Sequence, residues 1–590
     1  MIKFYYINKP DYINTMGVPG FFAWILRNFR KRILQTTLNI RPKCLYIDAN
    51  CLFHPECFRV LEHMDSFESE LLETKMFNRI INCLNYLENI SNPTHLMYIS
   101  VDGTAPLAKI SQQRKRRYKS VIDSKMKSEV KMKFGLKSND CWSNTVITPG
   151  TEFMERLHEK ILNHYKTRKS KIQYIYSSYH TPGEGEHKIL QHIKLNTLQD
   201  DNIVIYGLDA DLIFLAMAST RQNIYLLREA MHFNNKKDQV KEELYDIVED
   251  VSQEFIFVSI YETKNAYNQQ LKSILYNRGL INANFIESTD FSNDLIFVCF
   301  LLGNDFLPHF PSIDINKGGL DELIDSYVTC LEDVKTMLVT FENNKVKINH
   351  LFLMLLTKKM GEKEERYFNE TLPNYVRLNS KKKCFAQNDY SKELWDIENM
   401  KNVRVDDNIG LGIGSKDEWK FRYYEHYFDT MEHQDKFVET LSKLYIEGIM
   451  WVAKYYFEQC ADWRWQYPFN SSPFVSDISL YLKKLKDINN ITFEQTNHIP
   501  IMSQLLSVIP PAHSQILPMT YGQLMSDTNS SIIDLFPLIV KLDMLNKDQY
   551  WKCDPILPIL DISRILNVTK KLKLNKKEKK RSEILNDFVF

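Results

Sequence analysis

The sequence predicts an α/β protein with a mostly parallel central sheet flanked by helices. Over the first 230 or so residues, short apolar runs rich in Ile, Val, Leu and Tyr alternate with longer stretches in which apolar residues recur at helical spacing. That alternation is typical of βαβ units, which bring successive strands side by side in parallel. Several of the apolar runs also end at or near an acidic residue. In open α/β sheets, ligands bind outside the carboxyl ends of the strands, so these acids are the first candidates for a functional site.

The elements follow in order along the chain. Gly and Pro residues up to Gly20 give way to a helical pattern that begins near Phe21. Strands are expected at residues 44–48, 96–102, 172–177 and 203–206. Helices are expected at residues 74–90, 106–135, 151–169 and 185–196. A later apolar segment, residues 294–303, predicts a helix that ends on Gly303 beside Asp305.

The chain is expected to divide into five segments. Periodicity weakens after about residue 345, where Lys381-Lys-Lys and Gly410-Leu-Gly-Ile-Gly414 are typical of loops. Aromatic residues become frequent after residue 420, and the chain turns strongly basic from Lys570. The predicted segments are an N-terminal extension (1–15), an α/β domain (16–345), a linker (346–420), a mainly helical region packed against the first domain (421–568) and a basic C-terminal tail (569–590).

Composition predicts a soluble intracellular protein. Of the 590 residues, 44% are hydrophobic and 25% are charged, as in ordinary globular proteins. No apolar run approaches the length of a membrane span, and the N-terminus does not resemble a signal peptide. The ten cysteines are scattered without a C-x₂₋₄-C pair, which favours a reducing compartment over a disulfide framework or a zinc site. The formal net charge is +1, so any contact with nucleic acid must come from local basic patches.

Carboxylates at predicted element ends point to a metal site. Glu184 with Glu186 and Asp209 with Asp211 form two i,i+2 pairs, and in an extended backbone each pair would aim at one point. Taken singly, each acid could be a strand-end cap or a surface residue. Together the set is seven acids, which would repel one another without a cation: Asp48, Asp102, Glu184, Glu186, Asp209, Asp211 and Asp305. All-oxygen ligands favour Mg²⁺ or Mn²⁺, and two ions about 4 Å apart would use this many oxygens in phosphoryl transfer. Asp290 and Asp294 are weaker candidates, because acids also favour helix N-termini.

A basic face is predicted on the helix that follows Asp102. Lys109, Gln113, Arg116 and Arg117 fall at i, i+4, i+7 and i+8. Such a cluster can hold a terminal phosphate through charge-assisted bonds. The alternatives are a general contact with a nucleic-acid backbone and a merely solvated face.

These motifs, in this order and spacing, resemble the Xrn-type 5′→3′ exoribonucleases. Over residues 16–320 the resemblance is carried by Met16-Gly-Val-Pro, Asp48-x-Asn50-x₃-His54, Asp102-Gly-x-Ala-Pro-x-Ala-Lys109, Ile147-Thr-Pro-Gly-Thr151, Pro182-Gly-Glu-Gly-Glu-His-Lys188, Tyr206-Gly-Leu-Asp-Ala-Asp-Leu212, Leu227-Arg-Glu229 and Leu302-Gly-Asn-Asp-Phe-Leu-Pro-His309. A second region is matched more loosely by Tyr423-Tyr424, Glu447-Gly448, Trp463-x-Trp465-x-Tyr467-Pro468 and residues 517–561.

The resemblance implies a nuclease core like that of PIN and flap nucleases in residues 16–345. It implies processive hydrolysis of single-stranded RNA with a 5′-monophosphate end, by a two-metal-ion mechanism that releases nucleoside 5′-monophosphates. The seven acids would hold two Mg²⁺ or Mn²⁺ ions, and Lys109, Gln113, Arg116 and Arg117 would bind the 5′-phosphate. His54 and Trp465, with Trp463 as the alternative to Trp465, would stack on the leading bases.

The same resemblance implies a monomer that acts in mRNA decay, with the decapping machinery upstream and no membrane partner. The expected compartment is the cytoplasm, or the nucleus if the basic tail is a targeting signal. Two other functions stay open: a flap-type, structure-specific DNA nuclease and a catalytically silent RNA-binding protein. The intact set of seven acids argues against the silent protein.

Three features depart from the family pattern. Fifteen residues precede Met16, so either Met1 or Met16 starts the working protein. Cys51 stands where the family often has glycine. The long C-terminal extensions of some family members are expected to be absent.

Overall fold

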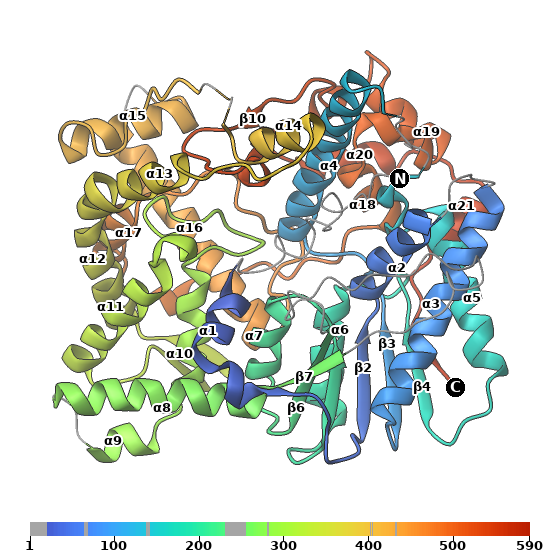
Figure 1. Ribbon diagram of the computed structural model, residues 1–590, viewed down its shortest axis with the longest axis horizontal. Coiled ribbons are helices and arrows are strands. Elements are labelled where there is room, and N and C mark those ends of the chain that lie inside the picture. The colour runs from blue at the N-terminus through green and yellow to red at the C-terminus, as the bar shows by residue number, and fades with distance from the viewer. Residues whose placement is uncertain are drawn as a thin grey trace.

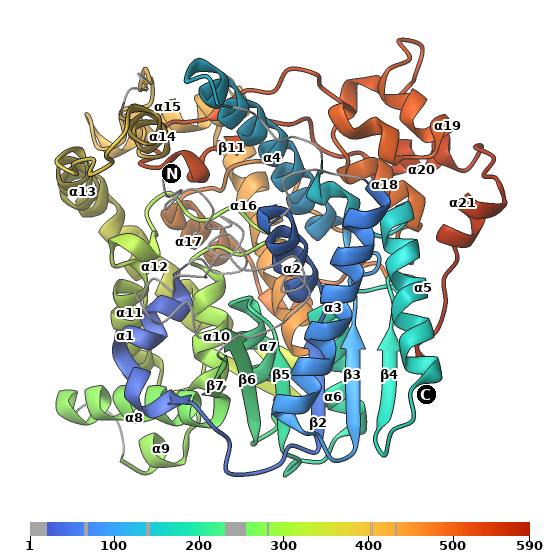
Figure 2. The ribbon, with the colours of Figure 1, turned by 45° about the vertical axis from the view of Figure 1, so that its right-hand side comes forward.

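A computed structural model describes residues 20–63, 69–136, 142–229, 255–279, 283–401, 403, 405–430 and 434–590. The predicted extension at 1–15 and the Met16-Gly-Val-Pro motif lie outside the described residues. An eight-stranded sheet stands at the centre with helices on both of its faces (Figures 1 and 2). The predicted fold class is therefore confirmed.

The sheet is parallel in its middle and antiparallel at its edges. Its strand order is β1-β7-β6-β5-β2-β3-β4-β12. The strands are β1 (Leu34–Gln35), β2 (Cys44–Asp48), β3 (Leu96–Ser100), β4 (Gln173–Ser177), β5 (Ile203–Tyr206), β6 (Ile224–Glu229), β7 (Phe255–Ser259) and β12 (Phe588–Val589). The five strands from β6 to β4 pair in parallel, whereas β1, β7 and β12 pair antiparallel with their neighbours. The carboxyl ends of β2, β3, β4 and β5 consequently meet at one edge.

Alternate residues of the strands feed two cores. On β2, Tyr46 faces one core while Leu45 and Ile47 face the other, because successive side chains of a strand point to opposite faces. The first core includes α1 (Phe21–Ile33), α6 (Gly185–Asn196), α7 (Asp211–Ala218), α8 (Ile260–Arg278) and α10 (Ser292–Phe300). The second includes α2 (Asn50–His63), α3 (Ser69–Ser91) and α5 (Glu152–Thr167). Burial on both faces explains why the parallel strands are continuous apolar runs.

The predicted basic helix is confirmed as α4 (Leu107–Lys133). Its first turn follows Pro106, whose fixed φ suits a helix start. The helix stands beyond the carboxyl ends of the parallel strands and reaches toward the helical region (Figure 2). Its first turns therefore lie over the edge where the acids gather.

The prediction of a linker at 346–420 is wrong, because this segment is mainly helical. It contains α12 (His350–Arg366), a π-helical turn (Tyr367–Thr371), α13 (Leu372–Ser380), α14 (Asp389–Glu398) and the start of α15 (Lys416–Phe428). An apolar stripe on α12, including Phe352, Leu356 and Met360, is buried in the first core. None of the side chains of α13 is buried.

The rest of the helical region packs against the sheet domain. Its other helices and short strands are α9 (Ala283–Ser288), α11 (Gly319–Val334), β8 (Val339–Glu342), β9 (Lys345–Ile348), α16 (Gln434–Phe457), α17 (Val475–Lys484), α18 (Ile501–Val508), α19 (Met519–Gly522), β10 (Leu542–Asp543), β11 (Asp554–Pro555), α20 (Ile562–Thr569) and α21 (Lys576–Arg581). The first core is continuous from the sheet into α16 and α17. Within the described part of the chain, no helix combines the length and apolarity needed to cross a membrane.

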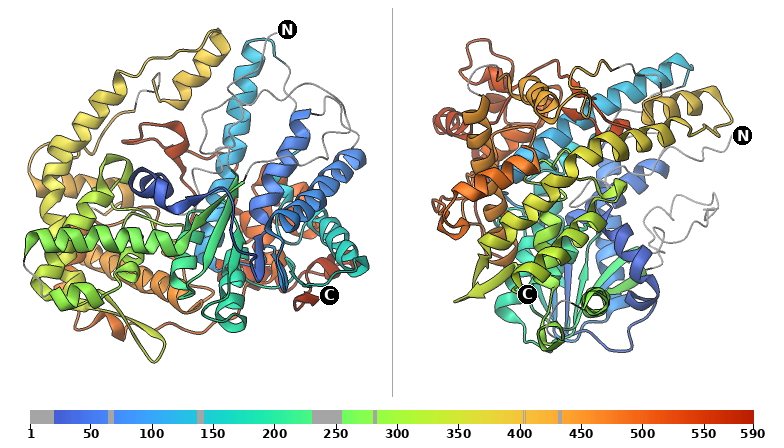
Figure 3. Two further views of the ribbon diagram at one scale, coloured as in Figure 1. Left: turned by 60° about the horizontal axis from the view of Figure 1, so that its bottom comes forward. Right: turned by 90° about the vertical axis from the view of Figure 1, so that its left-hand side faces the viewer.

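The segment predicted as a separate basic tail, 569–590, is instead packed on the sheet domain. Its last residues form β12, which pairs antiparallel with β4, and the Tyr174 and Phe590 backbones exchange two hydrogen bonds. Arg581 is buried, and its guanidinium donates to the Gly150 carbonyl (3.1 Å). Figure 3 shows this end of the chain beside the sheet domain. A count of charges in this segment indicates neither that Arg581 is buried nor that residues 588–589 form a strand.

Candidate active site

All seven predicted acids gather at the carboxyl edge of the parallel strands. Asp48 is the last residue of β2, Asp102 follows β3, and Asp209 lies in the loop after β5. The remaining four come from the loop after β4, from the starts of α6 and α7, and from the loop after α10: Glu184, Glu186, Asp211 and Asp305. Their charges act on one another throughout the set, for example Asp48 with Asp102 and Asp209, and Asp211 with Asp305. The acids therefore form a single site.

The two i,i+2 pairs converge for a different reason from the one predicted. Glu184 is the N-cap of α6 and Glu186 lies in its first turn. Asp211 begins α7, and Asp209 lies just before it. The pairs therefore lie at helix N-termini and not in extended strands. The partial positive charge of a helix N-terminus favours carboxylates, which explains why both pairs stand at these junctions.

Lys109, in the first turn of α4, forms ion pairs with two of the acids. Its Nζ lies 2.7 Å from Glu184 Oε2 and 2.7 Å from Asp305 Oδ2. Gln112 Nε2 donates to the other oxygen of Asp305 (3.2 Å). Lys109 is buried, yet the charges of Asp305 and Glu184 outweigh that burial and hold the lysine pKa well above its usual value. The first turns of α4 thus bring positive charge directly into the carboxylate cluster.

Burial and mutual repulsion make the carboxylates hard to ionise together. Burial, followed by the charges of Asp102 and Asp209, raises the pKa of Asp48 to about 8. Burial also raises the pKa of Asp209 to about 6, and the pKa values of Glu186 and Asp211 rise well above the ordinary range. A divalent cation would reverse these shifts, since it favours every ionised form at once.

Buried oxygens that lack partners indicate where a cation would fit. Asp48 Oδ1, Glu186 Oε2 and Asp211 Oδ1 are shielded from solvent and have no hydrogen-bond partner among the described residues. Buried polar atoms in proteins are nearly always satisfied, so an unmatched set of carboxylate oxygens calls for another group. Hard divalent cations such as Mg²⁺ and Mn²⁺ take such oxygen ligands. The residues present therefore fit a divalent metal site.

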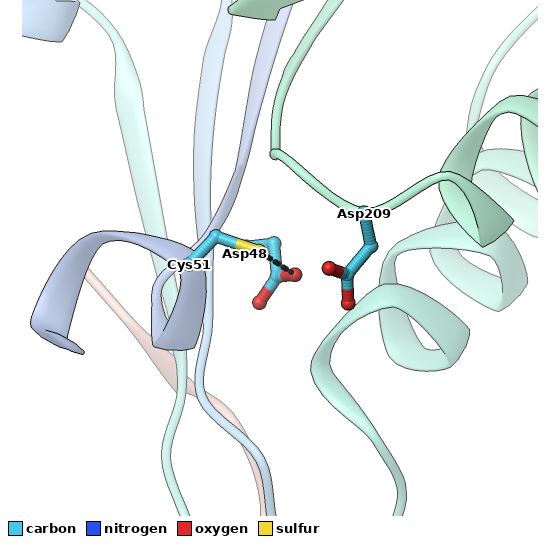
Figure 4. A group of neighbouring side chains, drawn as sticks. All are labelled: Asp48, Cys51 and Asp209. Carbon is cyan, nitrogen blue, oxygen red and sulfur yellow. Dashed lines mark hydrogen bonds between the residues drawn. The ribbon is translucent and has the colours of Figure 1, made fainter. Parts of the chain in front are cut away.

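Cys51 lies inside this site. Its Sγ donates to Asp48 Oδ2 at 3.0 Å. Ligand atoms of Asp48, Cys51 and Asp209 all lie within 4.8 Å of one another. Figure 4 shows the three side chains and the hydrogen bond from Cys51 to Asp48. Burial and the two carboxylates raise the pKa of the Cys51 thiol well above its usual value, so the thiol keeps its proton while no cation is bound.

Residues outside the predicted set of site residues hold the acids in place. The Tyr455 hydroxyl on α16 donates to Glu184, and Tyr456 bonds to Asp211. The Gly185 amide donates to Asp102 Oδ1 (2.7 Å), and Asn50 Oδ1 accepts from the Asp102 amide (3.1 Å). Each tyrosine lies more than 240 residues beyond the acid that it bonds, so only the packing of α16 brings it here.

The predicted phosphate-binding residues separate into two groups. Lys109 contacts the acids, whereas Arg116 lines a cavity of about 1800 Å³ that also reaches Asp305. Arg117 donates to Thr148 Oγ1 (2.7 Å). The Gln113 Oε1 atom is buried without a hydrogen-bond partner in the described part of the chain. All four residues remain on the first three turns of α4, beside the acids.

His54 lies close to the two arginines. Burial, followed by the charges of Arg116 and Arg117, lowers its pKa to about 3. The imidazole is therefore neutral near pH 7, which suits a flat group that stacks on a base. Its role in base stacking stays a prediction.

Trp465 ends a stack of aromatic rings that leads to the acids. Its ring lies over Trp451 (5.3 Å between centroids, 21°), which lies over Tyr455 (4.9 Å, 13°). A Cβ on Gly448 would come within 2.8 Å of the Trp465 ring, so glycine is needed there. Trp463 instead meets His498 edge to face, and its carbonyl accepts from the Leu107 amide. Both tryptophans are half-buried, and the stack favours Trp465 as the residue coupled to the site.

The two weaker acid candidates have structural partners. Asp294 is fully buried, and its carboxylate accepts from the Tyr327 hydroxyl and from the amides of Leu338 and Val339. Asp290 accepts from Asn268 and from the Ser292 amide. These hydrogen bonds link helices and turns, so both acids have structural partners.

Comparison with known families matches nearly the whole chain. The profile described as "XRN 5'-3' exonuclease N-terminus" matches residues 16–230. The profile described as "Xrn1 helical domain" matches residues 287–406 and 374–590. The first match covers strands β1 to β6, and the second covers the helices from α10 onward together with β12.

Individual relatives align along most of this chain. It is 30% identical to human "5'-3' exoribonuclease 1" over 96% of its own length and 35% of that protein's length. It is 26% identical to the Drosophila melanogaster "5'-3' exoribonuclease 2 homolog" over 93% of its length and 70% of the relative's. It is also 26% identical to Saccharomyces cerevisiae "5'-3' exoribonuclease 1", over 98% of its length and 44% of the relative's. The chain thus spans about a third of the human protein and about two thirds of the fly protein.

Proposed function

Because the chain belongs to the XRN family of 5′-3′ exonucleases, we propose that it hydrolyses single-stranded RNA from a 5′-monophosphate end. The products are nucleoside 5′-monophosphates, released one after another. The observation that supports this most strongly is the arrangement at the start of α4. There a helix that carries Lys109, Gln113, Arg116 and Arg117 directly adjoins a cluster of seven carboxylates.

The carboxylates are assigned to two divalent cations, Mg²⁺ or Mn²⁺. Such a pair supplies Lewis acidity to the phosphoryl oxygens and a water of lowered pKa. Asp48 at the end of β2, with Asp209 and Asp211 beside the start of α7, would supply oxygens to the cations, and their buried setting excludes bulk water. Tyr455 holds Glu184 in one orientation by its hydrogen bond. Partners of this kind fix ligand geometry, so they share in catalysis without touching the substrate.

The basic residues are assigned to the end of the RNA. A guanidinium offers planar, paired donors that match phosphate oxygens. Arg116 presents such a group to the cavity, and Lys109 connects that region with the acids. A phosphate held here places the first phosphodiester beside the carboxylates. Neutral His54 and Trp465 are assigned to stacking on the leading bases, which is independent of sequence.

The proposed function is tested by the decay of one single-stranded RNA that carries a 5′-monophosphate, a 5′-triphosphate or a 5′-hydroxyl. With Mg²⁺, we expect the monophosphate form alone to disappear, with mononucleotides as products. EDTA is expected to stop the reaction, since the acids cannot act together without a cation. Internal cuts that ignore the 5′ end would instead indicate an endonuclease. Preference for a flap DNA substrate would support the flap-type alternative, and absence of any cleavage would support the silent RNA-binding protein.

Arg116→Gln is expected to reduce the preference for 5′-monophosphate ends about tenfold or more. The loss of one charge-assisted hydrogen bond to phosphate costs about 1.5–3 kcal/mol, and about 1.4 kcal/mol corresponds to tenfold. The measurement compares kcat/KM on 5′-monophosphate and 5′-hydroxyl RNA.

Lys131→Gln is the matched control, because Lys131 lines the same cavity on the same helix about 20 Å further along. It should weaken both substrates alike or neither. An equal loss on both RNAs in Arg116→Gln would assign Arg116 to the RNA backbone in general.

We further propose a place for this reaction in cytoplasmic mRNA decay. Its substrate must come from a reaction that leaves a 5′-monophosphate on RNA, and decapping is a reaction of that class. Cell fractionation and the RNA ends that accumulate when the protein is depleted would test both parts. Accumulation of 5′-monophosphate RNA in the nucleus alone would move the proposed site of action there.

A further inference from the structure

The loop that carries Glu184 is fastened to residues 585–587. The Leu585 amide donates to the His180 carbonyl (3.3 Å), and the Thr181 hydroxyl donates to the Leu585 carbonyl (3.0 Å). These residues lead into β12, which pairs with β4, and Figure 2 shows this end of the chain near β4. A segment from the far end of the chain therefore holds the loop after β4 just before its carboxylate.

Asp587 provides the side-chain part of this attachment. Its Oδ1 accepts a hydrogen bond from the Thr181 hydroxyl (3.2 Å), and its Oδ2 accepts one from the Tyr98 hydroxyl (3.0 Å). Tyr98 is buried on β3, a strand that is paired on both sides, so its position is fixed by the sheet. One carboxylate thus connects a fixed strand with the loop that carries Glu184.

The position of Thr181 bears on two of the seven acids. The Gly103 amide donates to the Gly183 carbonyl (2.9 Å), which ties the loop after β3 to the loop after β4. A Cβ on Gly103 would overlap the Thr181 carbonyl oxygen, so the two backbones are in direct contact there. Asp102 directly precedes Gly103, and Glu184 directly follows Gly183. A shift of Thr181 therefore displaces both carboxylates.

Asp587 also places a negative charge near a buried lysine. Lys188 Nζ donates to the carbonyls of Ser178 (3.0 Å) and Thr181 (3.3 Å). Burial lowers the pKa of Lys188 to about 8, and the charge of Asp587 opposes that shift. Asp587→Asn separates this charge from the hydrogen bonds, because an amide keeps hydrogen-bonding atoms and carries no charge.

We propose that Asp587 is a positioning residue of the active site. Through its hydrogen bonds to Thr181 and Tyr98 it holds the loops of Asp102 and Glu184 in the arrangement that binds the catalytic cations. The effect on turnover rests on the proposed nuclease function, whereas the effect on cation binding stands on the contacts described. Asp587 is assigned to neither the substrate nor the cations and acts through Thr181.

The binding test measures the affinity of the tightest Mn²⁺ site by calorimetry on metal-free protein. We expect Asp587→Ala to weaken it about tenfold or more, as the loss of a partner behind a metal ligand does. Asp587→Asn should stay within about threefold of the unchanged protein, because its amide oxygen accepts from Tyr98 while its amide nitrogen donates to Thr181. Unchanged affinity in Asp587→Ala would overturn the proposal. An equal loss in both variants would assign the effect to the charge near Lys188 and overturn it too.

Arg581→Met is the matched control for general attachment of this segment. Arg581 donates to the Gly150 carbonyl (3.1 Å), just before α5 and on neither loop. The control is expected to lower the melting temperature, because it removes a buried hydrogen bond, and to leave the Mn²⁺ affinity within about threefold. A loss of affinity equal to that in Asp587→Ala would mean that attachment alone matters, which would overturn the specific role of Asp587.

Turnover on 5′-monophosphate RNA gives the second readout. We expect Asp587→Ala to lower kcat about tenfold or more and to leave KM within about threefold, because the residues assigned to the 5′-phosphate lie on α4. Thr181→Val removes the hydrogen bond from the loop side and should give the same loss. The double variant should lose no more than either alone, since both changes act on one contact, and additive losses would overturn the route through Thr181. No turnover in any protein would count against the nuclease function, while the Mn²⁺ affinities would still decide the role of Asp587.

Discussion

Asp209→Asn is expected to lower turnover by about 1000-fold or more while RNA binding survives. The change keeps the shape of the side chain and removes one anionic oxygen from the centre of the carboxylate cluster. Metal ions contribute several kcal/mol to transition-state stabilisation, and about 1.4 kcal/mol corresponds to a factor of ten. The measurements are single-turnover decay of 5′-monophosphate RNA and its affinity at the same salt concentration. Turnover within about tenfold of the unchanged protein would remove Asp209 from the metal site.

Asp294→Asn is the matched control for this loss. Asp294 is also a buried aspartate, but it accepts hydrogen bonds from Tyr327 and two backbone amides at the edge of the helical region. The control is expected to lower the melting temperature, because it leaves amide donors poorly matched, and to spare turnover. In EDTA, Asp209→Asn should instead melt at or above the temperature of the unchanged protein, since it relieves repulsion among carboxylates.

The metal-free protein is expected to lose stability as the pH rises from about 4 to about 8. Asp48 titrates near 3.8 when unfolded and near 8 in the folded protein. Between these values the folded carboxyl holds a proton that the unfolded one has released, so raising the pH favours unfolding. The stabilising contribution is fully present below about pH 4 and is lost by about pH 8. The slope is about 1.4 kcal/mol per pH unit for each proton taken up on folding.

This pH dependence is measured by denaturant unfolding in EDTA at a series of pH values. Asp48→Asn should flatten it, because an amide has no proton to lose. Mg²⁺ should also flatten it and stabilise the protein most at the alkaline end, where its ligands are ionised. Metal-free stability that rises with pH across this window would contradict the assigned repulsion among the acids.

The sheet and its acids could be predicted from the sequence because the signals are local. Continuous apolar runs such as Cys44–Asp48 mark strands buried on both faces, and Asp48 closes one of them. The basic face of α4 follows from spacing alone, since residues four and seven apart share one side of a helix. Convergence at one edge then follows from the parallel order of the strands.

The parts that could not be predicted depend on packing between distant segments. Nothing near Tyr455 in the sequence shows that its hydroxyl meets Glu184, and only the position of α16 against the sheet decides this. Lys109 was assigned to phosphate by spacing, while its contacts with Glu184 and Asp305 depend on the depth at which α4 sits. The sequence does not distinguish Arg581 from the other basic residues near it, because its burial and its hydrogen bond to the Gly150 carbonyl depend on a contact 431 residues away in the chain. The spacing of residues along a helix identifies which of them share a face, but it does not identify the residues that this face contacts.

The edge strand β12 has a consequence for synthesis on the ribosome. Strands β2 to β5 emerge early and can pair with one another, but β4 meets its last neighbour only through residues 588 and 589. The Thr181 hydroxyl, three residues before Glu184, donates to the Leu585 carbonyl (3.0 Å), so this loop also waits for the same segment. Contacts so far apart in sequence form late. A nascent chain therefore contains all seven acids before the loop that carries Glu184 can form its contact with Leu585, and the proposed active site is complete only after residues 580–590 have left the exit tunnel.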